Sequence, residues 1–185
     1  MVSESDIDVE FADREPLADP LEWFDLWLEA VDELGVKYPN AMTLATADPS
    51  GQPHARTVLL KGYDQRGFVF YTNYRSTKGR DLEANPRASL QVYWRMIDRQ
   101  FRLEGSVERL GEQESDDYFA SRPRGSQLGA WASDQSQPLA SREALMEQYR
   151  QVEQRFDGEP VPRPPHWGGF RIVADRMVFW RAGAS

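Results

Sequence analysis

Basic side chains gather in one short stretch of an otherwise acidic chain. Six of the 22 lysines and arginines lie between His54 and Arg80. Of the 30 acidic residues in the sequence, only Asp64 falls in this stretch. Arg56 falls on an expected strand, and Lys78 falls at the start of an expected helix. The free N–H groups and the dipole of a helix N-terminus favour an anion, and arginine offers a forked donor to phosphate. We interpret this stretch as the holder of a phosphate-bearing cofactor; a solvated basic face is the alternative.

A second group that could bind an anion lies between two expected helices. Tyr118 and Arg122 are four residues apart, so they share one helix face. Arg122 precedes Pro123, where a helix normally ends, and Ser126 would cap the next helix. With Arg124 nearby, guanidinium, phenol and hydroxyl groups converge on a helix N-terminus, which predicts a second phosphate site. A capping cluster with exposed arginines is the alternative.

One strand could serve both anions. Side chains alternate between the two faces of a strand, so Arg56 and Lys61 point in opposite directions and Lys61 is free for the second site. Two phosphorylated small molecules side by side would fit a cofactor and a substrate. Trp131, Trp167 and Trp180 could supply flat walls for an aromatic ring, although core packing is the commoner use of tryptophan.

The residues available for catalysis by the chain itself are few. The two histidines, His54 and His166, lie far apart and lack the spacing of a metal motif or a catalytic triad. Cysteine is absent from the sequence, which excludes disulfides, cysteine-based zinc sites and thiol nucleophiles. We therefore expect no metal and no catalytic side chain, and a cofactor that supplies the chemistry.

Composition narrows the class of protein further. A net charge of -8 argues against nonspecific nucleic-acid binding and against docking on anionic membranes. The acidic, polar N-terminus does not read as a signal peptide, and no apolar run approaches the length of a membrane span. We expect a cytoplasmic protein with a mobile arm over residues 1–18 and a single domain over 19–185.

The elements that would position these residues are mainly strands. Asp19 and Pro20 predict a helix start, and apolar residues at helical spacing continue to Gly35. Short turns between strands predict a mainly β fold, an antiparallel barrel of six or so strands with flanking helices. Strands are expected at 41–47, 53–61, 68–72, 88–94, 99–110, 169–174 and 176–181, and further helices at 78–85, 111–121, 126–132 and 141–156.

Several motifs, in this order and spacing, resemble the pyridoxamine 5'-phosphate oxidase family over about residues 19 to 181. They are Arg-Thr-Val-Leu-Leu-Lys (56–61), Phe-Tyr-Thr-Asn (70–73), Ser-Arg-Pro-Arg-Gly-Ser-Gln-Leu-Gly-Ala-Trp-Ala-Ser (121–133), Gln-Ser (135–136), Trp-Gly-Gly-Phe-Arg (167–171) and Phe-Trp (179–180). The resemblance implies an FMN-binding split barrel and an obligate homodimer with two FMN sites at its interface.

The resemblance also implies a role for each matching residue. The FMN phosphate would be held by Arg56, Lys78 and the neighbouring Thr77. The flavin ring would meet Thr57, Val58, Leu59, Leu60, Lys61, Tyr71, Thr72, Gln100, Gln135, Ser136 and Trp180, the last three from the partner subunit. The substrate phosphate would meet Lys61, Tyr118, Arg122 and Ser126. The implied reaction oxidises pyridoxamine or pyridoxine 5'-phosphate to pyridoxal 5'-phosphate with dioxygen as acceptor, giving hydrogen peroxide, in vitamin B6 salvage.

Two departures from the family pattern keep alternatives open. Thr77 stands where many members have arginine, which weakens the expected hold on the FMN phosphate. The family usually continues past the Phe-Trp strand into an Arg-Leu-His segment, a further arginine and a last strand, so we expect the C-terminal segment to be missing here. The alternatives are a related flavin oxidase of secondary metabolism, of the phenazine type, and a non-catalytic module that binds FMN or pyridoxal phosphate.

Overall fold

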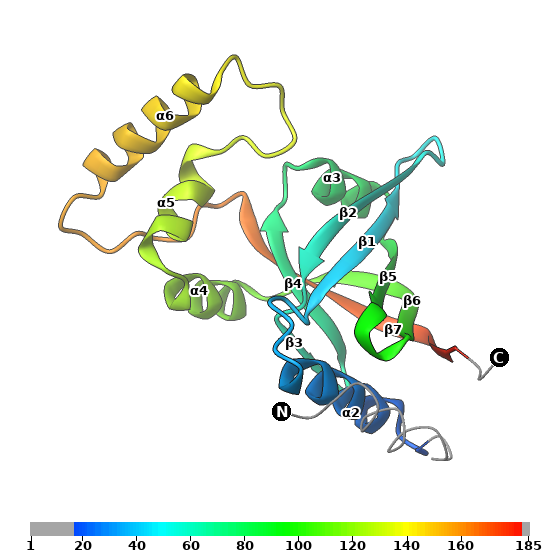
Figure 1. Cartoon of the computed structure of the whole chain (residues 1–185). Coiled ribbons are helices and arrows are strands. Elements are labelled where there is room, and N and C mark those ends of the chain that lie inside the picture. Colours follow the sequence, from blue (N-terminus) through cyan, green and yellow to red (C-terminus); the bar gives the residue numbers. More distant parts are fainter. Residues whose placement is uncertain (1–16, 183–185) are drawn as a thin grey trace.

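The computed structural model describes residues 17–182, which form one curled antiparallel sheet with helices around it (Figure 1). The predicted arm over 1–18 lies outside the described residues except for its last two. In chain order the elements are α2 (Pro20–Glu33), β1 (Ala41–Ala47), β2 (Pro53–Leu59), β3 (Gly62–Asp64), β4 (Gly67–Asn73), α3 (Thr77–Ala84), β5 (Arg87–Trp94), the 3-10 turn η1 (Arg95–Ile97), β6 (Arg99–Arg109), α4 (Glu112–Ser121), α5 (Arg124–Ala132), α6 (Arg142–Arg155) and β7 (Trp167–Arg181).

The strand order β2-β1-β5-β6-β7-β4-β3 places two consecutive strands, β2 and β3, at opposite edges of the sheet. Only Leu60 and Lys61 separate those edges in the chain, so the sheet must curl until they meet. The hydrogen bonds show this closure, because Leu60 N donates to Asn40 O before β1 while Lys61 N donates to Val69 O in β4. The predicted split barrel is confirmed, with seven strands in the sheet.

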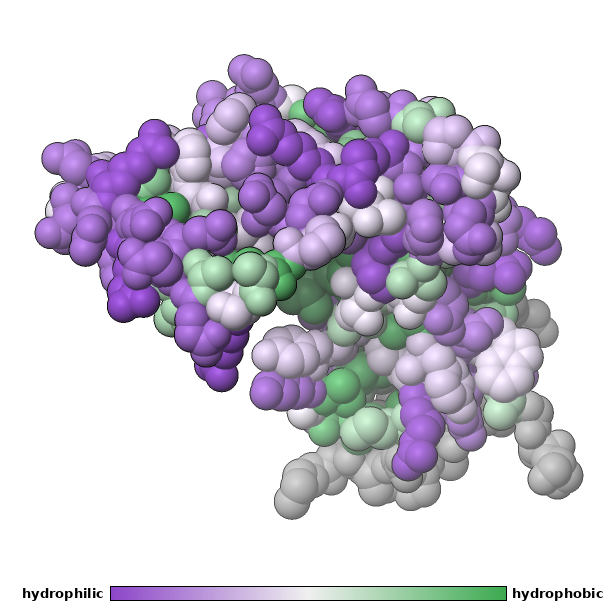
Figure 2. All heavy atoms as spheres, turned by 90° about the horizontal axis from the view of Figure 1, so that it is seen from above, coloured by the Kyte–Doolittle hydropathy of each residue, from purple (hydrophilic) through white to green (hydrophobic). Residues whose placement is uncertain are grey.

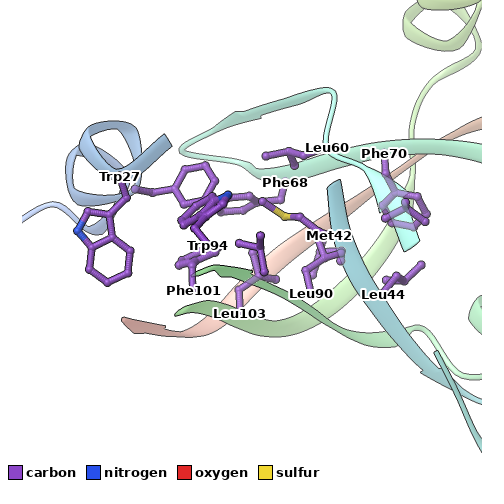
Figure 3. Packing of buried hydrophobic residues seen from close by; sticks show 14 of the residues in the cluster. Trp27, Met42, Leu44, Leu60, Phe68, Phe70, Leu90, Trp94, Phe101 and Leu103 are labelled. Atoms are coloured by element: carbon purple, nitrogen blue, oxygen red, sulfur yellow. The ribbon is translucent and has the colours of Figure 1, made fainter. Parts of the chain in front are cut away.

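Aromatic side chains fill the barrel, and α2 closes one end of it (Figures 1 and 3). Asp19 caps α2 by accepting a hydrogen bond from Leu21 N, and Pro20 occupies the first helical turn, as predicted. Phe24 from this helix is fully buried, with its ring centroid 4.5 Å from that of Phe101 and 5.3 Å from that of Phe68. Burying one such ring contributes about 2–3 kcal/mol, so α2 is a structural part of the barrel.

A smaller core fixes the helices that follow β6. Phe119 of α4, Leu128 of α5 and Trp167 of β7 are buried together with Phe156 and Val161. This cluster holds the α4–α5 corner against β4 and β7, where the second anion site was predicted. In contrast, α6 has no buried residue and extends away from the barrel, on a side whose surface is mostly hydrophilic in Figure 2.

The last strand differs from the prediction. Residues 169–181 were expected to form two strands around a turn at Asp175, but β7 is continuous and pairs with β6 and β4. Glu104 pairs with Arg176 and Gly105 with Ala174, so Asp175 is an extra residue that forms a β-bulge in β7. A Cβ at Gly105 would lie 2.0 Å from Val173 O, so the bulge requires glycine there. The bulge accommodates Asp175 without ending the strand.

Other boundaries moved by a few residues. Strand β2 ends at Leu59 rather than at residue 61, and the three-residue strand β3 was not predicted. Among the described residues, no helix is both long enough and apolar enough to cross a membrane.

Candidate functional site

The N-terminus of α3 holds a buried lysine whose acceptors are neutral. Ser76 caps the helix by accepting from Gly79 N, as the sequence predicted for Ser76 or Thr77. Lys78, only 6% exposed, donates through Nζ to Ser76 Oγ and to Gln135 Oε1, each at 3.3 Å. A Cβ at Gly79 would lie 2.1 Å from Tyr74 O, so glycine is needed for this close approach.

Charge and burial both act on this ammonium group. The pKa of Lys78 is lowered to about 8, mainly by burial and also by the positive charge of Arg56, while the negative charge of Asp81 acts in the opposite direction. A buried cation is costly unless it is paired. The site therefore favours a ligand that brings negative charge to Nζ.

Arg56 lies beside Lys78 but is already engaged within the protein. Its Nη1 donates to Thr46 Oγ1 at 2.7 Å and to Leu44 O at 3.2 Å, and its Nη2 lies 3.7 Å from Asp81 Oδ2. Burial lowers the pKa of Arg56, against the effect of Asp81. Arg56 does not line the cavity at Lys78, so the structure brings its charge, rather than a free donor fork, to the predicted phosphate site.

Two adjoining cavities link Lys78 to the α4–α5 corner. The first has a volume of about 200 Å³ and the second about 400 Å³. Five residues line both cavities, namely Tyr71, Thr72, Arg122, Gln135 and Trp167. The first cavity also has Thr57, Val58, Leu59, Lys61, Lys78 and Tyr118 in its walls, and the second has Asn73, Ser126, Gly129, Ala130 and Ser133. Most of the predicted cofactor and substrate residues thus share one groove.

Arg122 is the second cation of this groove. It ends α4, where its guanidinium carbon lies 4.5 Å from the centroid of the Trp167 ring. Its Nη1 atom is buried and has no hydrogen-bond partner in the part of the chain that the structure describes. Burial lowers the pKa of Arg122, against the effect of Tyr118. A buried donor without a partner costs roughly 1–3 kcal/mol, so an anion bound here would stabilise the site.

Aromatic rings build a platform next to Arg122. Tyr118 stacks on Tyr71 with ring centroids 3.8 Å apart and an angle of 14° between the planes. Trp167 is nearly parallel to both rings, at 5.6 Å from Tyr71 and 6.2 Å from Tyr118. This platform brings β4, β7 and α4 together, and it places the predicted Tyr118–Arg122 pair on one wall.

Ser126 lines the groove in a different role from the one predicted. Helix α5 begins at Arg124 with Pro123 at its cap position, so Ser126 lies inside the first turn and does not cap the helix. The prediction placed the helix start two residues too late because proline fits the start of a helix as well as the end of the preceding one. The Ser126 side chain is exposed at this N-terminus, where it is available to a ligand.

Gln135 and Thr72 complete the wall near Lys78. Thr72 Oγ1 donates to Gln135 Oε1 at 3.1 Å, so the amide oxygen accepts from both Thr72 and Lys78. Gln135 was expected to come from the partner subunit, whereas here it joins the groove of its own chain. The next residue, Ser136, has a φ of 68°, which is uncommon for a residue other than glycine.

Two predicted flavin contacts lie elsewhere. Gln100 and Trp180 are cross-strand partners on β6 and β7, and neither lines the two cavities. Trp180 is 49% exposed, and nearby Tyr93 and Met96 are also exposed. Thr77 is half-buried at the first position of α3, and its predicted phosphate contact stays a prediction.

Trp131 and the two histidines do not line the two cavities of the groove. Trp131 donates through Nε1 to Pro162 O and packs against Phe156, so it serves the α5–α6 contact rather than the groove. His166 faces Trp131, and His54 contacts Asp81. Within residues 17–182, no group of three or more His, Cys, Asp or Glu could hold a metal ion.

Sequence reasoning missed one buried group beside the site. Asp81, on α3, is 4% exposed, and its Oδ2 atom contacts Thr46, His54 and Arg56. The available signal was an acid three residues after Lys78, which puts both side chains on one helix face.

The curled sheet is that of a split-barrel protein, and its groove holds one buried cation, Lys78, and one half-buried cation, Arg122, beside the aromatic platform. The family model described as pyridoxamine 5'-phosphate oxidase matches residues 28–156. The chain belongs to this family.

Curated relatives are similar over most of the chain. A pyridoxine/pyridoxamine 5'-phosphate oxidase from Rubrobacter xylanophilus is 58% identical over 163 residues, which are 88% of this chain and 75% of the relative. The protein of the same name from Bordetella avium is 53% identical over 173 residues, 94% of this chain and 81% of the relative.

Two solved structures share the fold. PhzG from Burkholderia lata, in complex with tetrahydrophenazine-1-carboxylic acid, superposes with a TM-score of 0.86 at 33% identity, covering 92% of this chain and 83% of PhzG. A pyridoxamine 5'-phosphate oxidase-related, FMN-binding protein from Nostoc punctiforme has a TM-score of 0.70 at 19% identity, covering 89% of this chain and 85% of its own. The second likeness supports the fold alone.

Proposed function

We propose that this protein is an FMN-dependent oxidase that converts pyridoxamine 5'-phosphate or pyridoxine 5'-phosphate to pyridoxal 5'-phosphate. Dioxygen is the final acceptor and hydrogen peroxide is the by-product; with the amine substrate, water is also consumed and ammonia is released. The proposal rests on one observation above the others: a single groove contains two cations, the buried Lys78 and the half-buried Arg122, and within residues 17–182 neither has a hydrogen bond to a carboxylate. Two phosphorylated ligands, a cofactor and a substrate, would satisfy both.

The FMN phosphate fits the Lys78 end of the groove. Nζ there has two neutral acceptors and a lowered pKa, and the adjacent α3 N-terminus favours an anion. The charge of Arg56 adds to the attraction, and Thr77 in the first turn adds a hydroxyl donor. The ring of FMN would then lie along the strand and loop walls, namely residues 57–61, Tyr71, Thr72, Gln135 and Ser136.

The substrate phosphate fits the Arg122 end. The unpartnered Nη1 atom of Arg122 supplies a donor, and Tyr118 and Ser126 supply hydroxyl groups around it. Lys61, at the exposed end of the β2–β3 connection, lines the same cavity as Tyr118 and Arg122 and adds a second positive charge. The phosphate would fix the pyridine ring of the substrate over the flavin.

The residues of the chain bind and orient, and the cofactor supplies the redox chemistry. When bound, FMN would supply the hydride acceptor for the substrate carbon that bears the amine or hydroxyl group, and dioxygen would take up the electrons. The groove would hold both molecules by their phosphates, and this would orient them without a catalytic acid or base from the chain. The stacked rings of Tyr71, Tyr118 and Trp167 exclude water from one side of the groove.

The proposed enzyme is a homodimer. Gln100 and Trp180 are on a face of β6 and β7 separate from the groove, and an exposed Trp180 next to Tyr93 and Met96 is typical of an interface. In a second copy, these side chains would reach the flavin of the first. The expected FMN contacts of Gln100 and Trp180 would then be made across the dimer.

An oxidase of the phenazine type is the second candidate, favoured by the superposition with PhzG at a TM-score of 0.86. The higher identity to pyridoxine/pyridoxamine 5'-phosphate oxidases, 58% against 33%, supports the first candidate. The Lys61, Tyr118, Arg122 and Ser126 set also suits a phosphorylated substrate. A non-catalytic binding module is the third candidate.

Flavin bleaching separates the first candidate from the other two. The purified protein should be yellow, and pyridoxamine 5'-phosphate added without oxygen should bleach the flavin absorbance. Unphosphorylated pyridoxamine at the same concentration is the control and should bleach it far more slowly. A yellow protein whose flavin stays oxidised with the phosphate ester would support the second or third candidate. A protein that takes up no FMN would contradict the proposal.

A further inference from the structure

We propose that Asp81 and Thr46 are positioning residues for the cofactor phosphate: together they hold the Arg56 guanidinium next to Lys78. The inference rests on the proposed FMN site, and it concerns residues that do not line the groove. It assigns a binding role to a buried polar network that family membership alone does not explain.

Asp81 is the centre of that network. One atom, Oδ2, accepts from Thr46 Oγ1 at 2.6 Å, lies 2.9 Å from His54 Nδ1 and lies 3.7 Å from Arg56 Nη2. The Asp81 side chain is 5% exposed, whereas that of His54 is 33% exposed. A buried carboxylate with these contacts ties α3 to the end of β1 and the start of β2. It therefore fixes the helix that carries Lys78 relative to the strand that carries Arg56.

Thr46 sets the direction of the guanidinium. Its hydroxyl donates to Asp81, so its oxygen is left to accept, and Arg56 Nη1 donates to it at 2.7 Å. Leu44 O accepts from the same Nη1 at 3.2 Å. Two acceptors on β1 thus orient one side of the guanidinium. Without the Thr46 hydroxyl, Arg56 would keep its charge but lose this constraint.

Neutralising Arg56 and positioning Arg56 are two distinct roles for this network, and they predict opposite effects of removing Asp81. Lys78 and Asp81 are three residues apart on α3, and the charge of Arg56 disfavours the Lys78 ammonium. Arg56, Lys78 and Asp81 leave one net positive charge for an incoming phosphate. If charge alone mattered, removing Asp81 would leave two positive charges and tighten phosphate binding. If position matters more, the same change would weaken binding, because Arg56 would be released.

The first experiment replaces the hydroxyl and keeps every charge. We compare Thr46→Val, which is isosteric, with Thr46→Ser, which keeps the hydroxyl. Dissociation constants of FMN and riboflavin are measured for each apoprotein by quenching of flavin fluorescence. Thr46→Val should weaken FMN binding about tenfold, the effect of one hydrogen bond to a charged group. Riboflavin lacks the phosphate, so its affinity should stay nearly unchanged in both variants, and Thr46→Ser should bind FMN like the parent.

The ratio of FMN to riboflavin affinity separates positioning from general damage. A structural defect would weaken both flavins together, whereas lost positioning lowers the ratio. An unchanged ratio in Thr46→Val would overturn the inference while leaving the proposed function intact. A parent protein that binds FMN no better than riboflavin would instead contradict the proposed phosphate site itself.

If Thr46→Val yields little folded protein, the variant Asp81→Asn tests the positioning role instead. Asp81→Asn keeps an oxygen that can accept from Thr46 but removes the charge that faces Arg56. Weaker FMN binding with unchanged riboflavin binding supports positioning, although the site has become more positive. Tighter FMN binding would show that Asp81 acts only through its charge, and the inference would fail.

Discussion

The ammonium of Lys78 and the amide oxygen of Gln135 lie 3.3 Å apart, although 57 residues separate them in the chain. This contact joins the N-terminus of α3 to the loop that follows α5. It makes the proposed phosphate site a product of two distant segments.

Lys78→Met should separate stability from binding. Methionine has nearly the length of lysine and suits a buried site, so the apoprotein should become more stable at pH 7 by roughly 1–3 kcal/mol, because a buried charge is removed. FMN affinity should fall about a hundredfold, as expected for the loss of a charged phosphate ligand. Thermal unfolding of the apoprotein and fluorescence titration with FMN measure the two effects. A less stable apoprotein would show that Lys78 is structural.

The affinity for FMN should depend on pH through the same lysine. The pKa of Lys78 is about 8 in the free protein, and a bound phosphate favours the ammonium and raises that pKa. The complex therefore holds more protons than its free components above about pH 8. FMN affinity should be constant at pH 7 to 8 and fall as the pH rises further, in titrations of the parent. Riboflavin should show no such fall, and neither should FMN with Lys78→Met; a persistent slope in that variant would assign the effect to another group.

Local signals in the sequence were enough to predict much of this site. Asp19 and Ser76 were expected at helix caps, and both caps are present. Alternation predicted two faces for the strand that carries Arg56, and the burial of β2 alternates as predicted, although Lys61 lies beyond its end at Leu59. These features depend on neighbours within a few residues, which the sequence displays directly.

Features that depend on tertiary contacts could not be predicted in the same way. The continuity of β7 depends on a bulge at Asp175, which lies opposite Glu104 and Gly105 of the adjacent strand β6. The pairing of Gln135 with Lys78 depends on where the α4–α5 corner packs. Asp81 was passed over because a single acid on a short helix is normally exposed, and only its contacts with β1 and β2 show that it is buried.

Trp180→Lys should disrupt the proposed dimer. An added charge at the centre of an apolar interface opposes association, so light scattering should show a monomer where the parent is a dimer. FMN affinity should fall with it, because Trp180 and Gln100 would no longer reach the partner's flavin. Met146→Lys is a matched control, since Met146 is equally exposed, at 47%, but lies on α6. A dimeric Trp180→Lys protein, or a monomeric control, would place the interface elsewhere.

Arg122→Gln should act on the substrate and spare the cofactor. The change removes the unpartnered donor above Trp167 together with its charge, at a cost of about 2–3 kcal/mol in phosphate binding. The KM for pyridoxamine 5'-phosphate should therefore rise roughly 30- to 150-fold, while FMN affinity stays near that of the parent.

Two further variants test the geometry of this contact. Arg122→Lys keeps the positive charge but loses the planar fork, so its KM should lie between those of the parent and Arg122→Gln. Arg150→Gln is the control, because Arg150 is exposed on α6 and pairs with Glu147. Steady-state kinetics at saturating oxygen measure KM and kcat for all four proteins. If Arg122→Gln lost FMN and kept its KM, Arg122 would belong to the cofactor site, and the two phosphates would have to exchange places along the groove.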